Sequence, residues 1–212
     1  MNIPEYIKEY IKMLPSGVLG IAAAVFLYLA LSCLLRVKGK WWQRGLLLLG
    51  CWVTSFMIIY IGDIVNLSCN MVLFLAVLWI TCEGSGLKKL TLGLMFASAV
   101  FAFNAFYDNC VGLAAHFYGK DVLYADMYLV GRLWFAVFLY LAIRRRKPEP
   151  EFELSRPLWR LMLLLAFPPM GIMLSTILLR SPFYAIKGTV LSDAFLFLMV
   201  MLSFIGLLRA FA

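Results

Sequence analysis

Long apolar stretches, separated by short polar or charged segments, occupy almost the whole chain. Helices over these stretches are long enough to cross the roughly 30 Å hydrocarbon layer of a membrane. The expected spans cover about residues 17–35, 45–62, 64–82, 90–117, 122–143, 157–179 and 189–208. The pattern predicts an all-α fold, a polytopic transmembrane helix bundle with about seven spans. Six spans with a re-entrant segment are the alternative.

The first residues differ from the rest of the chain. Isoleucine recurs at every fourth position within residues 1–16, which predicts an amphipathic helix lying on the membrane surface. Pro15 and Gly17 are expected to end this helix. Residues 17–212 then form a single transmembrane bundle domain.

Two of the expected spans contain candidate breaks. The span over 90–117 is long, so its outer end is expected to break near Asp108 or Gly112. Pro168 and Pro169 lie in the middle of the span over 157–179, where proline kinks a helix. The kink is interpreted either as a hinge that transmits a signal or as a fixed bend that fits its neighbours.

Composition supports the membrane prediction. The chain is 64% hydrophobic, whereas a soluble domain is about half apolar. A net charge of +8 does not indicate nucleic acid, because most of the cations lie in short loops between spans. The bilayer is therefore the expected environment.

The distribution of the cations predicts the orientation. Loops on one side, with the segment after the last span, hold most of the 19 Lys and Arg residues: Arg36, Lys38, Lys40, Arg44, Lys88, Lys89, Arg144, Arg145, Arg146, Lys147, Arg156, Arg160 and Arg209. Cytoplasmic loops are enriched in cations. The N-terminus is therefore expected outside and the C-terminus in the cytoplasm.

No catalytic constellation is apparent in the chain. It contains none of the motifs GxxxxGK[ST], HExxH or GxSxG, which carry phosphate-binding, zinc-dependent and serine-hydrolase chemistry. Its five cysteines form no CxxC pair and are interpreted as small apolar packing residues. We expect no cofactor and no metal site.

Arg132 is the cation that lies inside an expected span, near the middle of residues 122–143. A charge at that depth is costly and usually functional. Tyr124 and Tyr128 precede it at four-residue intervals, so the three side chains share one helix face.

Asp108 and Asp126 are candidate partners for this arginine. Asn104 and Asp108 are four residues apart in the outer half of their span. At about 1.5 Å per residue, Asn104 lies at the depth of Arg132 and Asp108 one turn above. Because a desolvated arginine requires a carboxylate, Asp108 is the first choice of partner, ahead of Asp126.

Two interpretations of these polar residues stay open. The first is a ligand-binding cavity, open to the outside, with Arg132 at its floor; the candidate residues are Arg132, Asp108, Asn104, Tyr128, Asp126 and Asn70. It would hold a negative group, such as a peptide C-terminus, or a cationic ligand. The second is a structural ion pair. Asn70 belongs to a further polar stripe with Asp63 and Asn66, and Asp63 and Asp193 are expected to be helix caps.

The segment ELSRPLWRLMLLLAFPPMGIMLSTILL, residues 153–179, resembles a known family. It is similar to the penultimate span in the membrane sensor region of GHKL-type sensor histidine kinases, which include the peptide-receptor kinases of accessory-gene-regulator quorum sensing. Leu154, Trp159 and Pro168 stand at the positions of that family's leucine, tryptophan and central proline.

The resemblance implies a function. The chain would be the ligand-sensing receptor domain of a two-component system, multi-pass in the bacterial plasma membrane and homodimeric. It would pass an extracellular peptide or small-molecule signal to a cytoplasmic kinase and response-regulator module. The kinase activity would reside in a C-terminal region beyond this chain. The alternative is a substrate-binding membrane subunit of a vitamin or metal uptake transporter.

Overall fold

The computed structural model describes residues 5–56, 64–118, 126–146, 154–179 and 186–210. These ranges form α1 (Glu5–Leu34), α2 (Trp41–Phe56), α3 (Ile64–Thr81), α4 (Gly86–Tyr118), α5 (Asp126–Arg146), α6 (Arg156–Leu179) and α7 (Ile186–Ala210). Within them there is no strand, only an isolated bridge between Val37 and Cys82. The prediction of an all-α fold is confirmed for the described part of the chain.

Two expected helix breaks are absent. α1 is continuous from Glu5 to Leu34 through Pro15 and Gly17, and α4 continues past Asp108 and Gly112 to Tyr118. Both predictions were wrong. A proline removes one backbone donor but keeps a helical φ, and an unbroken helix satisfies the remaining backbone groups internally, as an apolar environment demands. Whether residues 1–16 lie on a membrane surface stays a prediction.

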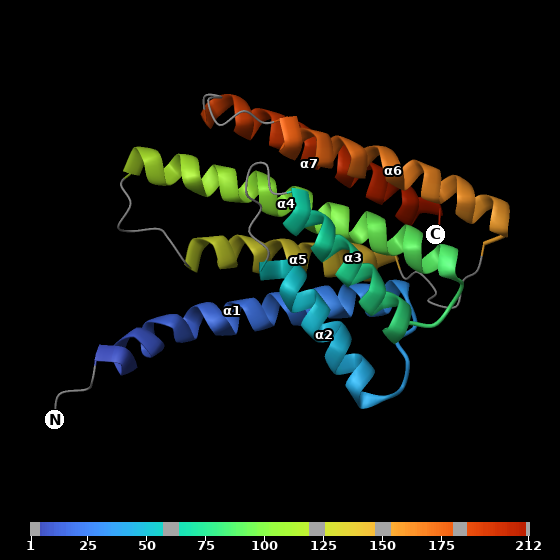
Figure 1. Cartoon of the computed structure of the whole chain (residues 1–212), viewed down its shortest axis with the longest axis horizontal. Helices are drawn as coiled ribbons and strands as arrows, with labels where there is room; N and C mark the ends of the chain where they lie inside the picture. The colour runs from blue at the N-terminus through green and yellow to red at the C-terminus, as the bar shows by residue number, and fades with distance from the viewer. Residues whose placement is uncertain (1–4, 57–63, 119–125, 147–153, 180–185, 211–212) are drawn as a thin grey trace.

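Within the described ranges, three helical segments are long and apolar enough to cross a membrane: Gly17–Leu34, Gly86–Ala114 and Met127–Arg146. Two further apolar segments, Val65–Thr81 and Val190–Gly206, are shorter. These segments indicate a membrane protein. The count of seven spans and the orientation of the termini stay predictions, although α1 begins and α7 ends at opposite ends of the bundle (Figure 1).

α4 is the central helix of the bundle. It packs against α6 and α7 on one side and also contacts α2, α3 and α5 (Figure 1). In the apolar 18-residue window within Gly86–Ala114 of α4, 78% of the residues are buried, against 39% in Gly17–Leu34 of α1. α1 packs instead against α5 and α2. A polar side chain on α4 can therefore reach several other helices.

Some of the basic loop residues have a local role at one end of the bundle. The backbone N–H of Lys38 donates to the carbonyl of Thr81 at 2.9 Å, and its Nζ donates to the carbonyl of Ile80 at 2.7 Å. Lys89 Nζ donates to the carbonyl of Cys82 at 3.3 Å. Cations are stabilised by the carbonyl groups at a helix C-terminus, so these lysines cap α3.

α5 approaches α4 closely at Gly131. A Cβ atom at this position would overlap the ring of Tyr107. That ring stacks on Phe103, with 5.5 Å between the centroids, and its hydroxyl donates to the Met127 carbonyl at 2.9 Å. The ring is thus held against the backbone of α5, and only glycine fits beside it.

We therefore expect Gly131→Ala to destabilise the bundle by about 1–3 kcal/mol, the usual cost of overpacking. The matched control is Gly206→Ala in α7, because a Cβ there meets no atom within 4 Å. Alanine favours a helix over glycine by up to about 1 kcal/mol, so the control should be neutral or stabilising. The measurement is unfolding by SDS in mixed detergent micelles. Equal effects of the two substitutions would contradict the packing argument.

Candidate functional site

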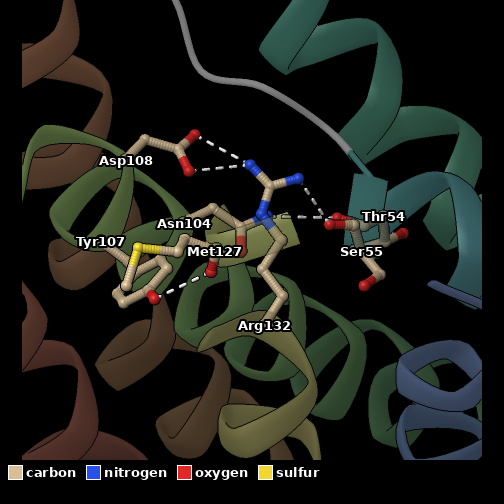
Figure 2. Close-up of polar contacts among 7 residues, drawn as sticks. All are labelled: Thr54, Ser55, Asn104, Tyr107, Asp108, Met127 and Arg132. Atoms are coloured by element: carbon tan, nitrogen blue, oxygen red, sulfur yellow. Dashed lines mark hydrogen bonds and ion pairs between the residues drawn. The ribbon is translucent and has the colours of Figure 1, made fainter. Parts of the chain in front are cut away.

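A buried ion pair connects α5 to α4. Arg132 Nη2 donates to both carboxylate oxygens of Asp108, at 2.8 Å and 2.9 Å (Figure 2). The Arg132 side chain is 4% exposed and that of Asp108 is 12% exposed. The predicted partnership of these two residues is confirmed, and it neutralises the cation where water is excluded.

The same guanidinium also binds the end of α2. Arg132 Nη1 donates to the Ser55 carbonyl at 3.1 Å, and Asn104 Nδ2 donates to the Thr54 carbonyl at 3.4 Å (Figure 2). α2 ends at Phe56, and the last carbonyls of a helix lack intrahelical donors and carry its negative dipole end. Arg132 and Asn104 therefore cap α2. The site joins three helices.

The guanidinium uses its donors unevenly. Nη2 serves both oxygens of Asp108, whereas Nε is buried and has no hydrogen-bond partner within the described ranges. A fork-to-fork pair would instead use two nitrogens, each facing one oxygen. The pair is thus strong without saturating the arginine.

Three phenylalanines form an apolar layer next to this polar cluster. Phe103 and Phe135 stack with 4.2 Å between ring centroids. Phe197 of α7 meets Phe103 at 5.6 Å and Phe135 at 5.7 Å. Phe103 adjoins Asn104 in sequence and Phe135 is one helical turn from Arg132, so the layer lies near the polar cluster along α4 and α5. Such aromatic contacts also favour specific ring positions.

A second polar link joins α4 to α7. Asn109 Nδ2 donates to Asp193 Oδ2, and Asp193 is 1% exposed. The expectation that Asp193 is a helix cap was wrong, because α7 already begins at Ile186. Sequence reasoning missed Asn109, which points away from the stripe of Asn104 and Asp108 by the helical period. Its position next to Asp108 in the sequence was the available signal.

Among the remaining candidates, Asn70 makes its described contacts within its own helix. Asn70 Nδ2 donates to the backbone carbonyl and the side chain of Asn66, both on α3. Tyr128 is half-buried on α5, one turn before Arg132. Asp126 is the first residue of α5, and its side chain lies outside the described residues.

Other expected features fall on parts that the structure does not describe. Asp63 and Tyr124 lie outside the described ranges, and so do the side chains of Pro168 and Pro169. The backbone of α6 is continuously helical from Arg156 to Leu179. The hinge at these prolines stays a prediction.

No group of three or more His, Cys, Asp or Glu side chains in the described part of the chain is arranged to hold a metal ion. No protein-family model, curated protein or solved structure matches the chain. The chemistry of the site is therefore argued from its geometry.

We expect Asp108→Leu alone to destabilise the protein by about 3–5 kcal/mol, because it leaves the Arg132 charge buried and unpaired. The double variant Asp108→Leu/Arg132→Met should recover most of this loss, since apolar residues of similar volume often replace a buried pair without cost. SDS unfolding in micelles measures both. A double variant as unstable as the single one would show that the capping of α2, rather than the charge balance, dominates.

Proposed function

We propose that the chain is a ligand-sensing transmembrane domain, and that the ion pair between Arg132 and Asp108 holds its resting state. The observation that carries this proposal is the buried Nε of Arg132, which has no partner among the described residues, beside an Nη2 that binds both oxygens of Asp108. An extracellular ligand with a carboxylate would take the edge formed by Nε and Nη2.

In this proposal the site responds to a ligand when the ligand's carboxylate replaces that of Asp108 on Arg132. A peptide C-terminus bound to two guanidinium nitrogens forms a fork-to-fork pair, which is stronger than contacts from one nitrogen. The charge of Arg132 stays neutralised throughout, so the buried site never holds an isolated cation. Asp108 is released, and it is the more exposed member of the pair, at 12%.

Release of Asp108 would remove the ion pair between α4 and α5 and leave the hydrogen bond from Tyr107 to Met127 and the aromatic layer as their described connections. Phe135 follows Arg132 by one turn on α5, and Phe197 on α7 contacts it at 5.7 Å. A shift of α5 would therefore bias the position of α7, provided that the ligand binds one arrangement better than the other. With the C-terminus in the cytoplasm, as the cation distribution predicts, α7 would carry this shift to a kinase module.

The resemblance to GHKL-type sensor regions supports the same proposal. Trp159, one of its residues, is 1% exposed, and Leu154 packs against the core. In this proposal the protein lies in a bacterial plasma membrane, and Pro168 and Pro169 are the candidate flex point of α6.

The test is binding of short peptides to the purified chain in lipid nanodiscs. The panel contains the same peptides with a free C-terminal carboxylate and with an amidated C-terminus. We expect amidation to weaken binding about 10- to 100-fold, because a hydrogen bond to a charged group contributes about 1.5–3 kcal/mol. Thermophoresis and hydrogen exchange of α4 and α5 report binding.

The matched variants separate binding from stability. Asp108→Leu/Arg132→Met removes both charges while retaining apolar packing, and should lose binding although it is folded. Arg160→Met removes an exposed arginine of α6 and should bind normally. Equal binding by the folded double variant, or no binding of any free-carboxylate peptide to the parent chain, would contradict the proposal and favour a purely structural ion pair.

The homodimer that the resemblance implies has a candidate interface on α3. Asn66 and Cys69 are exposed and Asn70 is half-buried, at helical spacing on one face. Exposed apolar residues, including Val65 and Leu73, surround them. Amides that face lipid favour helix association, and an amide both donates and accepts. The stripe is therefore complementary to itself in a second copy with two-fold symmetry.

Oxidation of membranes with copper phenanthroline tests this interface. We expect a disulfide-linked dimer that Cys69→Ala abolishes and that Cys33→Ala, in α1, leaves unchanged. Asn66→Leu/Asn70→Leu should reduce the cross-linked fraction several-fold, in line with about 0.6–2 kcal/mol per interhelical hydrogen bond. A dimer that persists in the Cys69→Ala variant would place the interface elsewhere.

A further inference from the structure

A large groove opens between the ends of α5 and α7, far from Arg132. Its volume is about 870 Å³, and its lining includes Phe138 and Leu141 of α5 and Ile205 of α7. At its end it is lined by Arg144, Arg145 and Arg146. We propose that this groove binds an anionic phospholipid, with the phosphate on the arginines and an acyl chain between the two helices.

The groove exists because α5 and α7 pack mainly on different helices. α7 packs on α4 and α6, whereas α5 packs mainly on α1 and less on α4, and direct contact between α5 and α7 is slight. Side chains of α5 and α7 therefore line the two sides of the groove, and its outer face is open. In a membrane this open face is turned to lipid.

The lining changes from apolar to cationic along one direction. Phe138, Leu141 and Arg145 follow one another on one face of α5 by the helical period. Phe138 and Leu141 are 55% and 53% exposed. The rise from Phe138 to Arg145 is about 10 Å, roughly a third of the hydrocarbon layer. An apolar wall of this length that ends in cations matches an acyl chain below an anionic headgroup.

The three arginines differ in the contacts that they already make within the protein. Arg144 donates to the Tyr140 hydroxyl at 2.9 Å and lies over the Tyr140 ring, which fixes its orientation. Arg145 and Arg146 are exposed and make no hydrogen bond or ion pair within the ranges that the structure describes. Basic pockets between membrane helices on the cytoplasmic side bind phospholipid headgroups, and the guanidinium fork suits a phosphate.

A bound lipid is not the sole reason for cations at this place. They follow the rule for cytoplasmic loops, which requires no bound molecule. The chain also continues with three glutamates, Glu149, Glu151 and Glu153, which are a second source of negative charge in the sequence. The apolar wall favours lipid, because neither a topological signal nor an acidic segment needs exposed Phe138 and Leu141.

The test is native mass spectrometry of the full chain, titrated in detergent with phosphatidylglycerol and, separately, phosphatidylcholine. We expect tighter binding of phosphatidylglycerol, and a loss of about 30-fold in Arg145→Gln/Arg146→Gln, at roughly fivefold per cation. The matched control is Arg156→Gln/Arg160→Gln, which removes the same charge from exposed positions at the start of α6. It should retain the preference.

Further variants and a competing ion distinguish three possible occupants of the groove: a phospholipid, a free phosphate ion and the acidic segment of the chain. Phe138→Ser/Leu141→Ser should weaken phosphatidylglycerol binding although every cation remains, and inorganic phosphate should not displace the lipid. Equal losses in the two arginine variants would overturn the proposal in favour of general surface charge. Displacement by inorganic phosphate would reduce the site to a free-anion site. Binding that appears only in Glu149→Gln/Glu151→Gln/Glu153→Gln would show that the acidic segment is the occupant.

Discussion

Burial of the Arg132 charge is the constraint on which the arrangement of α2, α4 and α5 depends. An arginine that is 4% exposed has to find its counter-charge and its acceptors inside the protein. Asp108 supplies the charge from α4 and Ser55 supplies a carbonyl from the end of α2. Each partner fixes a different helix, so the position of α5 is determined in two directions by one side chain. Gly131 then allows the close approach that this contact needs.

Polar residues on different faces of α4 contact different neighbouring helices. Asn104 and Asp108 lie on one face and reach α2 and α5, whereas Asn109 lies on another face and reaches Asp193 of α7. Because these links occur at nearly the same level of α4, the C-terminal half of this helix is held on several sides by polar contacts. The three phenylalanines of the apolar layer contribute only non-directional packing and preferred ring geometries. Polar contacts therefore specify how the helices are rotated and at which depth they meet, while apolar burial holds them together.

Much of this could be predicted from the sequence. Apolar runs and polar interruptions indicated the helices, and the depth argument identified Asp108 as the partner of Arg132. Periodicity identifies which residues share a face, but not which helix that face meets. For this reason the capping of α2 and the contact between Asn109 and Asp193 were not foreseen. The breaks expected at Pro15 and Gly112 depended on local preference, which an apolar surrounding overrides by favouring an unbroken backbone.

A structural and a sensory role of the ion pair make different demands on the same atoms. A pair that only stabilises the fold gains most when both carboxylate oxygens face separate guanidinium nitrogens, because Nε then has a partner as well. Here one nitrogen serves both oxygens and Nε lacks a partner among the described residues. An unsatisfied buried donor costs about 1–3 kcal/mol, and this cost is recovered by any ligand that engages Nε. Under the proposed sensory role, the unpaired Nε would favour the carboxylate of a ligand over that of Asp108, an advantage that a permanent structural pair does not need.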